Sequence, residues 1–312
     1  MSTLRISVVI PLYNKNNAIL HALNSVLAQS ILPVEIIIVN DGSTDGSELV
    51  VATLKHPLVK LVNQLNQGVS SARNRGIEEA KSEWVAFLDA DDVWLPEFLE
   101  TITILIEKYP DCSMVATSYF LQDSAGNRSG MHLKKILFDG EEGILTNYFQ
   151  VASNSHPPIH SSAVAIKKEA LITIGGFPQG VRSGEDLVTW AKLAFLYPVA
   201  YSLNPQSVFN LDLAHTYNDI PNRIPQIPDI VGNSLVGLYN QGKPIPGLRQ
   251  YIGHWHKMRA SIYLRLGMRW RSFSEAITSL YYDPANWKVA FYIFMLPLPS
   301  GLVNHLFRLS SK

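Results

Sequence analysis

The first hundred residues alternate between short runs of β-branched residues and segments with helical periodicity. The strand-like runs lie at residues 6–10, 34–39, 59–62 and 84–88. Each is followed by a segment whose apolar residues recur every three or four positions, as in an amphipathic helix. Strands that alternate with helices form parallel sheets, because each crossover returns the chain to the same end of the sheet. The sequence therefore predicts an α/β fold, with a mixed but mostly parallel sheet flanked by helices.

Polar side chains follow three of the predicted strands, at the point where each strand ends. Tyr13 and Asn14 come after the first, Asp41 after the second, and Asp89 and Asp91 after the fourth. Ligands of open parallel sheets bind outside the carboxyl ends of the strands. We therefore expect these three groups of residues to converge on one crevice.

The acidic run DADD at residues 89–92 follows a buried strand directly. An Asp-x-Asp in isolation is more often a solvated turn, but carboxylates crowded at a partly enclosed edge repel one another unless a cation joins them. Carboxylate oxygens suit Mg2+ or Mn2+, and Mg2+ commonly shares its ligand sphere with phosphate oxygens. The chain has neither G-x-x-x-x-G-K-S/T nor G-x-G-x-x-G, so the usual phosphate-binding loops are absent. These observations predict a metal-bound diphosphate.

Composition limits the classes of partner. The 26 basic and 26 acidic side chains cancel, so no overall field attracts nucleic acid. The single cysteine, Cys112, has no partner for an internal disulfide or a structural zinc site, which fits a reducing compartment and predicts a cytoplasmic location.

Three stretches of the chain carry a family resemblance. VVIPLYNKNNAILHALNSVLAQ, VEIIIVNDGSTDGS and NQGVSSARNRGIEEAKSEWVAFLDADD together resemble the family 2 glycosyltransferases of GT-A fold over residues 7–94. A looser similarity continues through IGGFPQGVRSGEDLVTWAKLA at residues 174–194. The resemblance implies a nucleotide-sugar site on a GT-A, Rossmann-like sheet.

The resemblance also implies roles for the residues that contact the nucleotide. Pro11 and Tyr13 would lie against the base, with Asn14 beside them. Asp41 would accept a hydrogen bond from the base, and Arg73 would lie near the nucleotide. The alternatives are structural: Pro11 ends a strand, Tyr13 packs, and Arg73 is a helix-surface charge.

A metal site is implied in the same way. Asp89 would contact the ribose or the metal, and Asp91 would ligate the Mn2+ or Mg2+ that bridges the diphosphate. His215 falls where some GT-A enzymes place a third metal ligand, although a lone histidine is more often structural.

The pair Glu185 and Asp186 has two readings. Ser183-Gly-Glu-Asp matches the S-x-x-D/E pattern of a helix N-cap. In the family resembled, an acidic residue of this pair is the base that deprotonates the acceptor hydroxyl, which assigns that role to Asp186 and an orienting role to Glu185. The two readings are compatible, because a helix N-terminus favours an ionised carboxylate.

The function implied is an inverting, metal-dependent glycosyltransferase that moves one sugar from a nucleotide-sugar, with UDP-sugar as the expected donor. The expected acceptor is a glycan or lipid-linked glycan of cell-surface polysaccharide. The chain departs from the family pattern at Lys192, where Arg is common, and this departure concerns the acceptor contacts. Separately, the absence of a Q-x-x-R-W motif and of clear membrane spans argues against a processive synthase. The alternatives are a catalytically silent nucleotide-sugar-binding scaffold and a sugar nucleotidyltransferase.

The expected domain organisation has two parts. Residues 1–218 form the GT-A domain, with a nucleotide-sugar half at 1–115 and an acceptor half at 116–218. Residues 219–312 form a mostly helical region that begins with a Pro, Asn and Gly-rich linker, and residues 248–280 have helical spacing.

Residues 289–307 contain no Asp, Glu, Lys or Arg. Pro297 and Pro299 divide this run into halves too short to cross a bilayer. Two readings remain: a packed helical hairpin, or a peripheral contact with the inner face of the cell membrane.

Overall fold

The computed structural model of the chain describes residues 5–211, 221 and 223–310. Two compact units can be distinguished: unit 1 comprises Met1–Thr146 and Ser155–Asn210, and unit 2 comprises Asn147–Asn154 and Leu211–Lys312. The short segment 147–154 therefore belongs with the C-terminal unit. The expected boundary between residues 218 and 219 lies outside the described residues.

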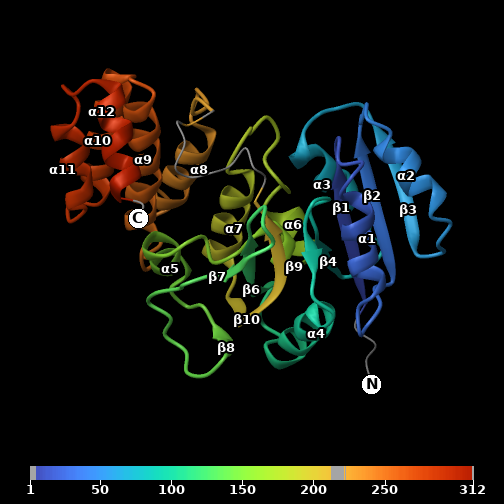
Figure 1. The fold of residues 1–312 in the computed structure, drawn as a ribbon. Helices are drawn as coiled ribbons and strands as arrows, with labels where there is room; N and C mark the ends of the chain where they lie inside the picture. The colour runs from blue at the N-terminus through green and yellow to red at the C-terminus, as the bar shows by residue number, and fades with distance from the viewer. Residues whose placement is uncertain (1–4, 212–220, 222, 311–312) are drawn as a thin grey trace. The chain divides into compact units, whose positions relative to one another are not determined.

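Unit 1 is built on one mixed sheet (Figure 1). Its strands run in the order β3-β2-β1-β4-β9-β6-β10-β5, and β7 pairs with β6 and β8 with β10. The strands are β1 (Ile6–Leu12), β2 (Glu35–Asp41), β3 (Val59–Gln64), β4 (Trp84–Phe87), β5 (Val93–Trp94), β6 (Met114–Gln122), β7 (Arg128–Gly130), β8 (Glu142–Ile144), β9 (Val164–Lys167) and β10 (Val199–Asn210).

One antiparallel strand, β9, interrupts the main run of parallel strands. Strands β3, β2, β1 and β4 pair in parallel. Strand β9 runs antiparallel to both β4 and β6, and β6 pairs in parallel with β10. The expected mixed, mostly parallel sheet flanked by helices is confirmed.

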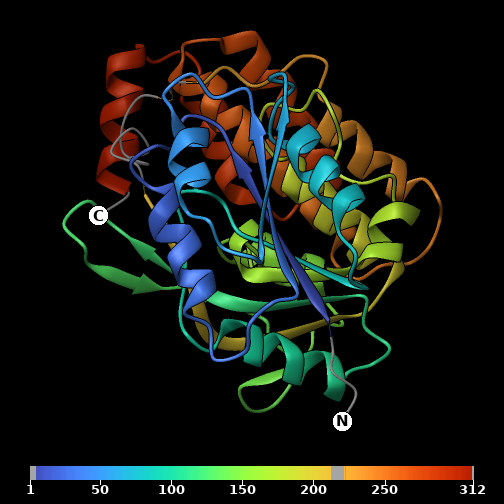
Figure 2. The same cartoon turned by 90° about the vertical axis from the view of Figure 1, so that its right-hand side faces the viewer.

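Helices cover both faces of this sheet (Figure 2). The helices of unit 1 are α1 (Ile19–Leu27), α2 (Ser47–Thr53), α3 (Val69–Glu79), α4 (Phe98–Lys108), a 3-10 turn η1 (Ser161–Ala163), α6 (Lys168–Thr173) and α7 (Glu185–Leu196).

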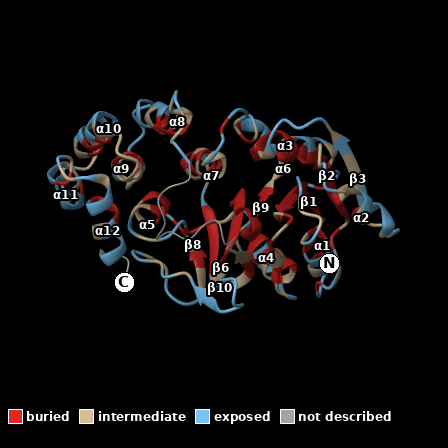
Figure 3. Ribbon diagram, turned by 45° about the horizontal axis from the view of Figure 1, so that its top comes forward, coloured by how far each residue is buried: buried red, intermediate tan, exposed pale blue. Residues whose placement is uncertain are grey.

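The alternation of side chains along β1 assigns its two faces. Val8 and Ile10 join the core that also contains Leu23 of α1. Val9 points the other way, toward α3, where a Cβ on Gly76 would lie 2.2 Å from Val9 Cγ1. Gly76 therefore lets α3 approach the sheet closely, as glycine does where a backbone must come near a neighbouring side chain. The central strands are buried (Figure 3).

The four strands predicted for the first hundred residues are all present, with ends shifted by up to two residues. The N-cap expected at Ser183 is wrong. Helix α7 begins at Glu185, its N-cap is Gly184 in the left-handed region (φ 88°), and no side chain caps it. A glycine tolerates this conformation without steric cost, so the chain turns into the helix there.

Unit 2 consists of helices in its described part: α5 (Tyr148–Asn154), α8 (Ile230–Tyr239), α9 (Leu248–Arg265), α10 (Arg269–Tyr282), α11 (Trp287–Phe294) and α12 (Ser300–Ser310). The predicted linker thus contains a helix, α8, whose N-cap Asp229 accepts a hydrogen bond from Gly232 N. Helix α9 is the central packing element: its Ala260 and Leu264 contact Val289 and Val303 in two small cores. No helix in the described chain is long and apolar enough to cross a membrane.

Candidate active site

The polar strand ends of unit 1 share one edge of the sheet. Strands β2, β1 and β4 are neighbours and run in the same direction. Their carboxyl ends carry Asp41, Tyr13 with Asn14, and Asp89. Three segments far apart in the sequence therefore meet where open parallel sheets bind ligands.

Arg73 of α3 is the electrostatic centre of this edge. Its side chain is 3% exposed and lies between two carboxylates, with Nη2 2.8 Å from Asp89 Oδ1 and Nη1 3.0 Å from Glu185 Oε1. The guanidinium also lies over the Phe177 ring, 5.1 Å from its centroid. Its Nε is buried and has no hydrogen-bond partner among the described residues. Arg73 is a buried connector between α3, the end of β4 and α7, which rules out the reading of a helix-surface charge.

The neighbouring loop is tied to the same helix. Asn74 Nδ2 donates to the Phe177 carbonyl at 2.9 Å, and Phe177 N donates to Asn74 Oδ1 at 2.8 Å. These two reciprocal hydrogen bonds hold the segment before α7 against α3. It therefore fixes where the first turn of α7 presents Glu185.

Arg73 and Asp89 stabilise each other's charged forms. Burial alone would raise the pKa of Asp89, but Arg73, together with His160 and Lys15, outweighs burial and lowers it below the usual range. Burial likewise opposes the charge of Arg73, yet Asp89 and Glu185 raise its pKa. Asp89 is thus an ionised carboxylate at the sheet edge.

Asp186 has the opposite character. Burial, reinforced by the negative charge of Glu185, raises the pKa of Asp186 to about 7. Arg73 lowers this pKa, and so does the hydrogen bond of 2.8 Å that Leu187 N donates to Asp186 Oδ1. A carboxylate whose pKa lies near the working pH is suited to take and release a proton.

Asp91 lies on the more open side of the same edge. Its Oδ2 is 2.6 Å from Lys15 Nζ, and their side chains are 34% and 37% exposed. The backbone is held from the other side, because Asn210 Nδ2 donates to the Asp91 carbonyl at 2.6 Å. Asp91 is therefore accessible to solvent and already faces a cationic group.

Asp92 is fully buried and has a different role. Its Oδ2 accepts a hydrogen bond of 2.5 Å from Ser162 Oγ, and its Oδ1 accepts one of 3.1 Å from Asn210 N. Burial, followed by the charge of Asp89, raises the pKa of Asp92 well above its usual value. Ser162 Oγ also accepts from Asp89 N at 3.0 Å. Asp92 thus anchors the turn that carries Asp89 and Asp91.

Two groups of residues at this edge offer ligand atoms of the kind that bind metals. Asp89, Asp92 and His160 each offer one ligand atom within 4.8 Å of the others. Both oxygens of Asp92 are occupied by protein donors, and His160 Nδ1 accepts from Ser162 N at 3.2 Å. Asp89 and Asp91 retain solvent exposure of 24% and 34%, and their carboxylate oxygens suit a hard divalent cation. Asp89 and Asp91 are therefore the more accessible carboxylates of this edge, and each already pairs with a cationic side chain, Arg73 and Lys15 respectively.

Asp41 is held at the other end of the edge. It is 2% exposed. Its Oδ1 accepts from Gln64 Nε2 at 2.8 Å and Gln67 N at 2.9 Å, and its Oδ2 accepts from Gly68 N at 2.8 Å. Asp41 therefore shapes the loop between β3 and α3, and one lone-pair direction of Oδ2 is left for a ligand.

The residues after β1 form the adjoining surface. Pro11 is buried within β1, and Tyr13 is 49% exposed. Asn14 adopts a left-handed conformation (φ 52°), donates its N–H to Ser43 Oγ and accepts from Thr44 N at 2.8 Å. The loops after β1 and β2 are therefore joined, with the Tyr13 ring next to them and open to solvent.

Of the expected site residues, the structure groups Arg73, Asp89, Glu185 and Asp186, with Asp91 on the same turn as Asp89. Tyr13, Asn14 and Asp41 lie at the ends of the adjacent strands. His215 lies outside the described residues. Sequence reasoning assigned no role to Lys15, Asp92, Ser162 or Asn210. Lys15 directly follows the strand-end pair Tyr13 and Asn14, and this position could have marked it as a site residue. The contact between Asp92 and Ser162 spans 70 residues and has no local sequence pattern.

Comparisons with known proteins give the family. The model of glycosyl transferase family 2 matches residues 7–175, more than half of the chain. A glycosyltransferase of Rickettsia conorii is 31% identical over 194 residues, which are 61% of this chain and 30% of that protein. The glycosyltransferase YibD of Escherichia coli is 46% identical over 103 residues, 32% of this chain and 30% of that protein. The chain thus spans about a third of the length of these relatives.

Solved structures give the fold. Residues 1–349 of S. aureus TarS, in complex with UDP-GlcNAc, superpose with a TM-score of 0.68 at 18% identity, covering 89% of this chain and 80% of that chain. The structural similarity covers 89% of this chain, whereas the family model covers residues 7–175. With the family match over more than half of its residues, this chain belongs to glycosyl transferase family 2.

Proposed function

We propose that the chain transfers one sugar from a nucleotide-sugar to an acceptor hydroxyl, with inversion at the anomeric carbon. The observation that carries the proposal is the charge arrangement around Arg73. It keeps Asp89 ionised at the sheet edge, while burial raises the pKa of nearby Asp186 to about 7. A single displacement needs both a base for the incoming hydroxyl and positive charge for the departing diphosphate.

Asp186 is the base in this proposal. Its carboxylate takes the proton of the acceptor hydroxyl as the new glycosidic bond forms and the bond to the diphosphate breaks. Glu185, held 3.0 Å from Arg73 Nη1, keeps the first turn of α7 in register with the sheet edge. Attack by the acceptor hydroxyl oxygen on the face opposite the leaving group gives the inverted product.

Asp89 and Asp91 would hold the divalent cation, Mn2+ or Mg2+. A metal bound there would neutralise charge on the departing nucleoside diphosphate. Lys15, whose ammonium lies 2.6 Å from Asp91 Oδ2, would have to release this oxygen for the metal to bind.

The nucleotide would lie against Tyr13 and Asp41, with Pro11, Asn14 and Arg73 shaping its pocket. The complex of TarS with UDP-GlcNAc supports a uridine donor by analogy of fold. The proposed acceptor is a glycan or lipid-linked glycan of cell-surface polysaccharide.

A donor-hydrolysis assay tests the proposal. A panel of nucleotide-sugars is incubated with the chain and Mn2+, and release of nucleoside diphosphate and free sugar is followed by mass spectrometry, with water taking the place of the acceptor hydroxyl. We expect one donor to be hydrolysed, and Asp186→Asn to slow this hydrolysis about 10²–10⁴-fold while leaving donor affinity unchanged. Lys192→Gln, a change outside the Arg73 cluster, serves as the matched control. Consumption of no donor, or full activity of Asp186→Asn, contradicts the assignment.

A further inference from the structure

Three consecutive helices of unit 2 each expose an apolar stripe. On α10 and α11 the exposed residues recur every three or four positions, and on α12 two of them lie seven positions apart, as side chains on one face of a helix do. They are Trp270, Phe273, Ile277 and Tyr281 on α10, Trp287, Phe291 and Phe294 on α11, and Leu302 and Leu309 on α12. Trp270, Trp287 and Phe294 are 85%, 73% and 75% exposed.

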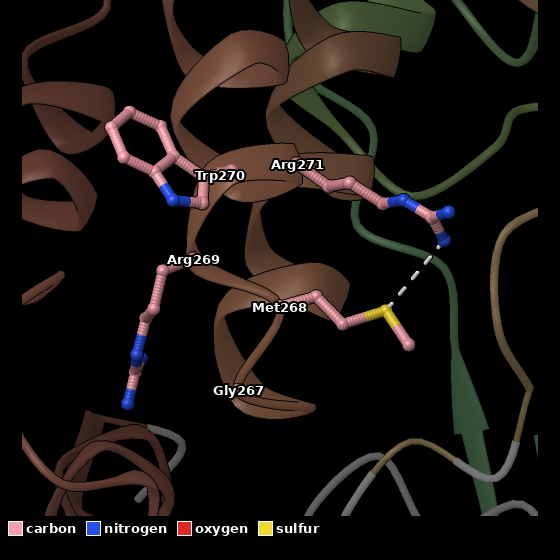
Figure 4. Close-up of a pocket in the computed structure, with 5 residues that line it drawn as sticks. All are labelled: Gly267, Met268, Arg269, Trp270 and Arg271. Atoms are coloured by element: carbon pink, nitrogen blue, oxygen red, sulfur yellow. Dashed lines mark hydrogen bonds between the residues drawn. The ribbon is translucent and has the colours of Figure 1, made fainter.

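These stripes point away from the core of the unit. On α10 the buried side is Ser272, Ala276 and Ser279, and both serines bond to carbonyls of α9. At 3.6 residues per turn, Trp270 and Ile277 lie on the other side of the helix. Figure 4 shows Trp270 projecting from the first turn of α10, with Arg269 and Arg271 leaving in other directions. Val289 is likewise the buried residue of α11, opposite Trp287 and Phe291.

An apolar cavity lies between two of the stripes. It has a volume of about 340 Å³, and Trp287, Phe291 and Met295 line it together with Leu306 and Phe307 of α12. Lys288 is among its lining residues. The stripes of α11 and α12 therefore belong to one surface, with a hollow that has an aromatic wall and a nearby ammonium group.

The C-terminal part of unit 2 has an excess of positive charge. The whole chain is neutral, but between residues 243 and 310 it has nine Lys and Arg against two acidic residues, Glu275 and Asp283. The carboxylate of Glu275 pairs with the side chains of His256 and Arg259. Each striped helix carries an exposed basic residue: Arg271 on α10, Lys288 on α11 and Arg308 on α12.

We propose that α10, α11 and α12 form a docking surface for an anionic phospholipid membrane. Aromatic rings enter the headgroup region, the basic residues meet lipid phosphates, and the cavity between α11 and α12 accepts part of an acyl chain. The charge favours a membrane over a second copy of the chain, because two such surfaces would bring like charges together. The proposal goes beyond the proposed function and depends on no residue of the active site.

Vesicle binding tests this proposal. The full chain is sedimented with vesicles of phosphatidylcholine alone and of phosphatidylcholine with phosphatidylglycerol, at low and at raised salt. We expect binding to the anionic vesicles only, weakened by salt. The Lys288→Gln/Arg308→Gln double variant should lower the partition coefficient about 30-fold, from about 1 kcal/mol for each basic residue. Trp287→Ser/Phe294→Ser should lower it by about tenfold or more.

Matched controls come from exposed residues of unit 1. Lys55→Gln/Lys81→Gln removes two exposed charges, and Leu49→Ser/Ile172→Ser removes two exposed apolar side chains. Both should leave vesicle binding within about twofold of wild type. The proposal is overturned if wild type stays in the supernatant, or if the unit 2 variants bind as well as these controls. A dimer seen by light scattering and dispersed by Trp287→Ser/Phe294→Ser, without vesicle binding, would assign the stripes to a second copy instead.

Discussion

Replacing Arg73 by methionine is the perturbation that bears most directly on the electrostatics of the site. Methionine keeps much of the apolar stem but removes the cation between Asp89 and Glu185, which lie 2.8 Å and 3.0 Å from it. Breaking a buried ion pair by removing one partner costs about 3–5 kcal/mol, because the other charge stays buried without compensation. Asp89 and Glu185 keep 24% and 13% of their side-chain exposure, so we expect a loss near the lower end, about 3 kcal/mol at pH 7.

The pH dependence of this loss has a defined sign. Arg73 lowers the pKa of Asp89 in the folded protein, so its stabilisation is present above the unfolded pKa of about 4 and is lost as pH falls through the lower folded value. The free-energy deficit of Arg73→Met should therefore be full at pH 7 and smaller below about pH 4.

Urea unfolding followed by tryptophan fluorescence measures this deficit, and Arg75→Met is the matched control. Arg75 pairs with Glu79 on the same helix, but its side chain is 48% exposed, and such pairs contribute about 0–1 kcal/mol. The reasoning is refuted if the two variants lose the same free energy of unfolding, or if the Arg73→Met deficit does not change with pH.

Other predictions concern single positions in unit 1. The kcat/KM of wild type should rise with pH through about 7 and then level off, because burial raises the pKa of Asp186 to that value and the base must be ionised; a flat profile from pH 6 to 8 would contradict its role. Gly76→Ala should lower the free energy of unfolding by about 1–3 kcal/mol, since the new Cβ would lie 2.2 Å from Val9 Cγ1, and adding Val9→Ala should restore part of the loss in the same urea titration. Asp41→Asn should cost about 1–3 kcal/mol by leaving a donor of Gln64, Gln67 or Gly68 facing an amide N–H, and donor affinity measured by calorimetry should fall with it.

Much of the fold was predictable because its signals are local. The β-branched runs of β1 and β2 and the helical spacing between them fix a parallel sheet without reference to distant contacts. Strands β6 and β10 were not predicted, since β6 leads into a Gly, Asp and Ser-rich stretch and β10 contains Pro205, where its pairing with β6 shifts register. The remainder of the sheet depends on pairings between distant segments, such as β9 with β4 and with β6, which no local pattern encodes.

The site was predictable to a similar extent. Strand order brings Asp89 to the edge near Asp41 and Tyr13, so the convergence of these strand ends follows from topology. The partnership of Arg73 with Glu185 spans 112 residues and depends on how α7 is held against α3. Asp92 is adjacent to Asp91 in sequence but is buried, because Ser162 and Asn210 complete its hydrogen bonds. Neighbouring carboxylates therefore differ in role through their surroundings.

Calorimetric titration of UDP in the presence of Mn2+, and again with EDTA, is the most direct test of the central claim that Asp89 and Asp91 join a divalent cation to a nucleoside diphosphate. Glu169→Gln, a change of an exposed carboxylate on α6, is the control for Asp91→Asn. We predict that Mn2+ tightens UDP binding to wild type and Glu169→Gln, and that Asp91→Asn loses this gain. UDP that binds equally tightly with Mn2+ and with EDTA would contradict the account.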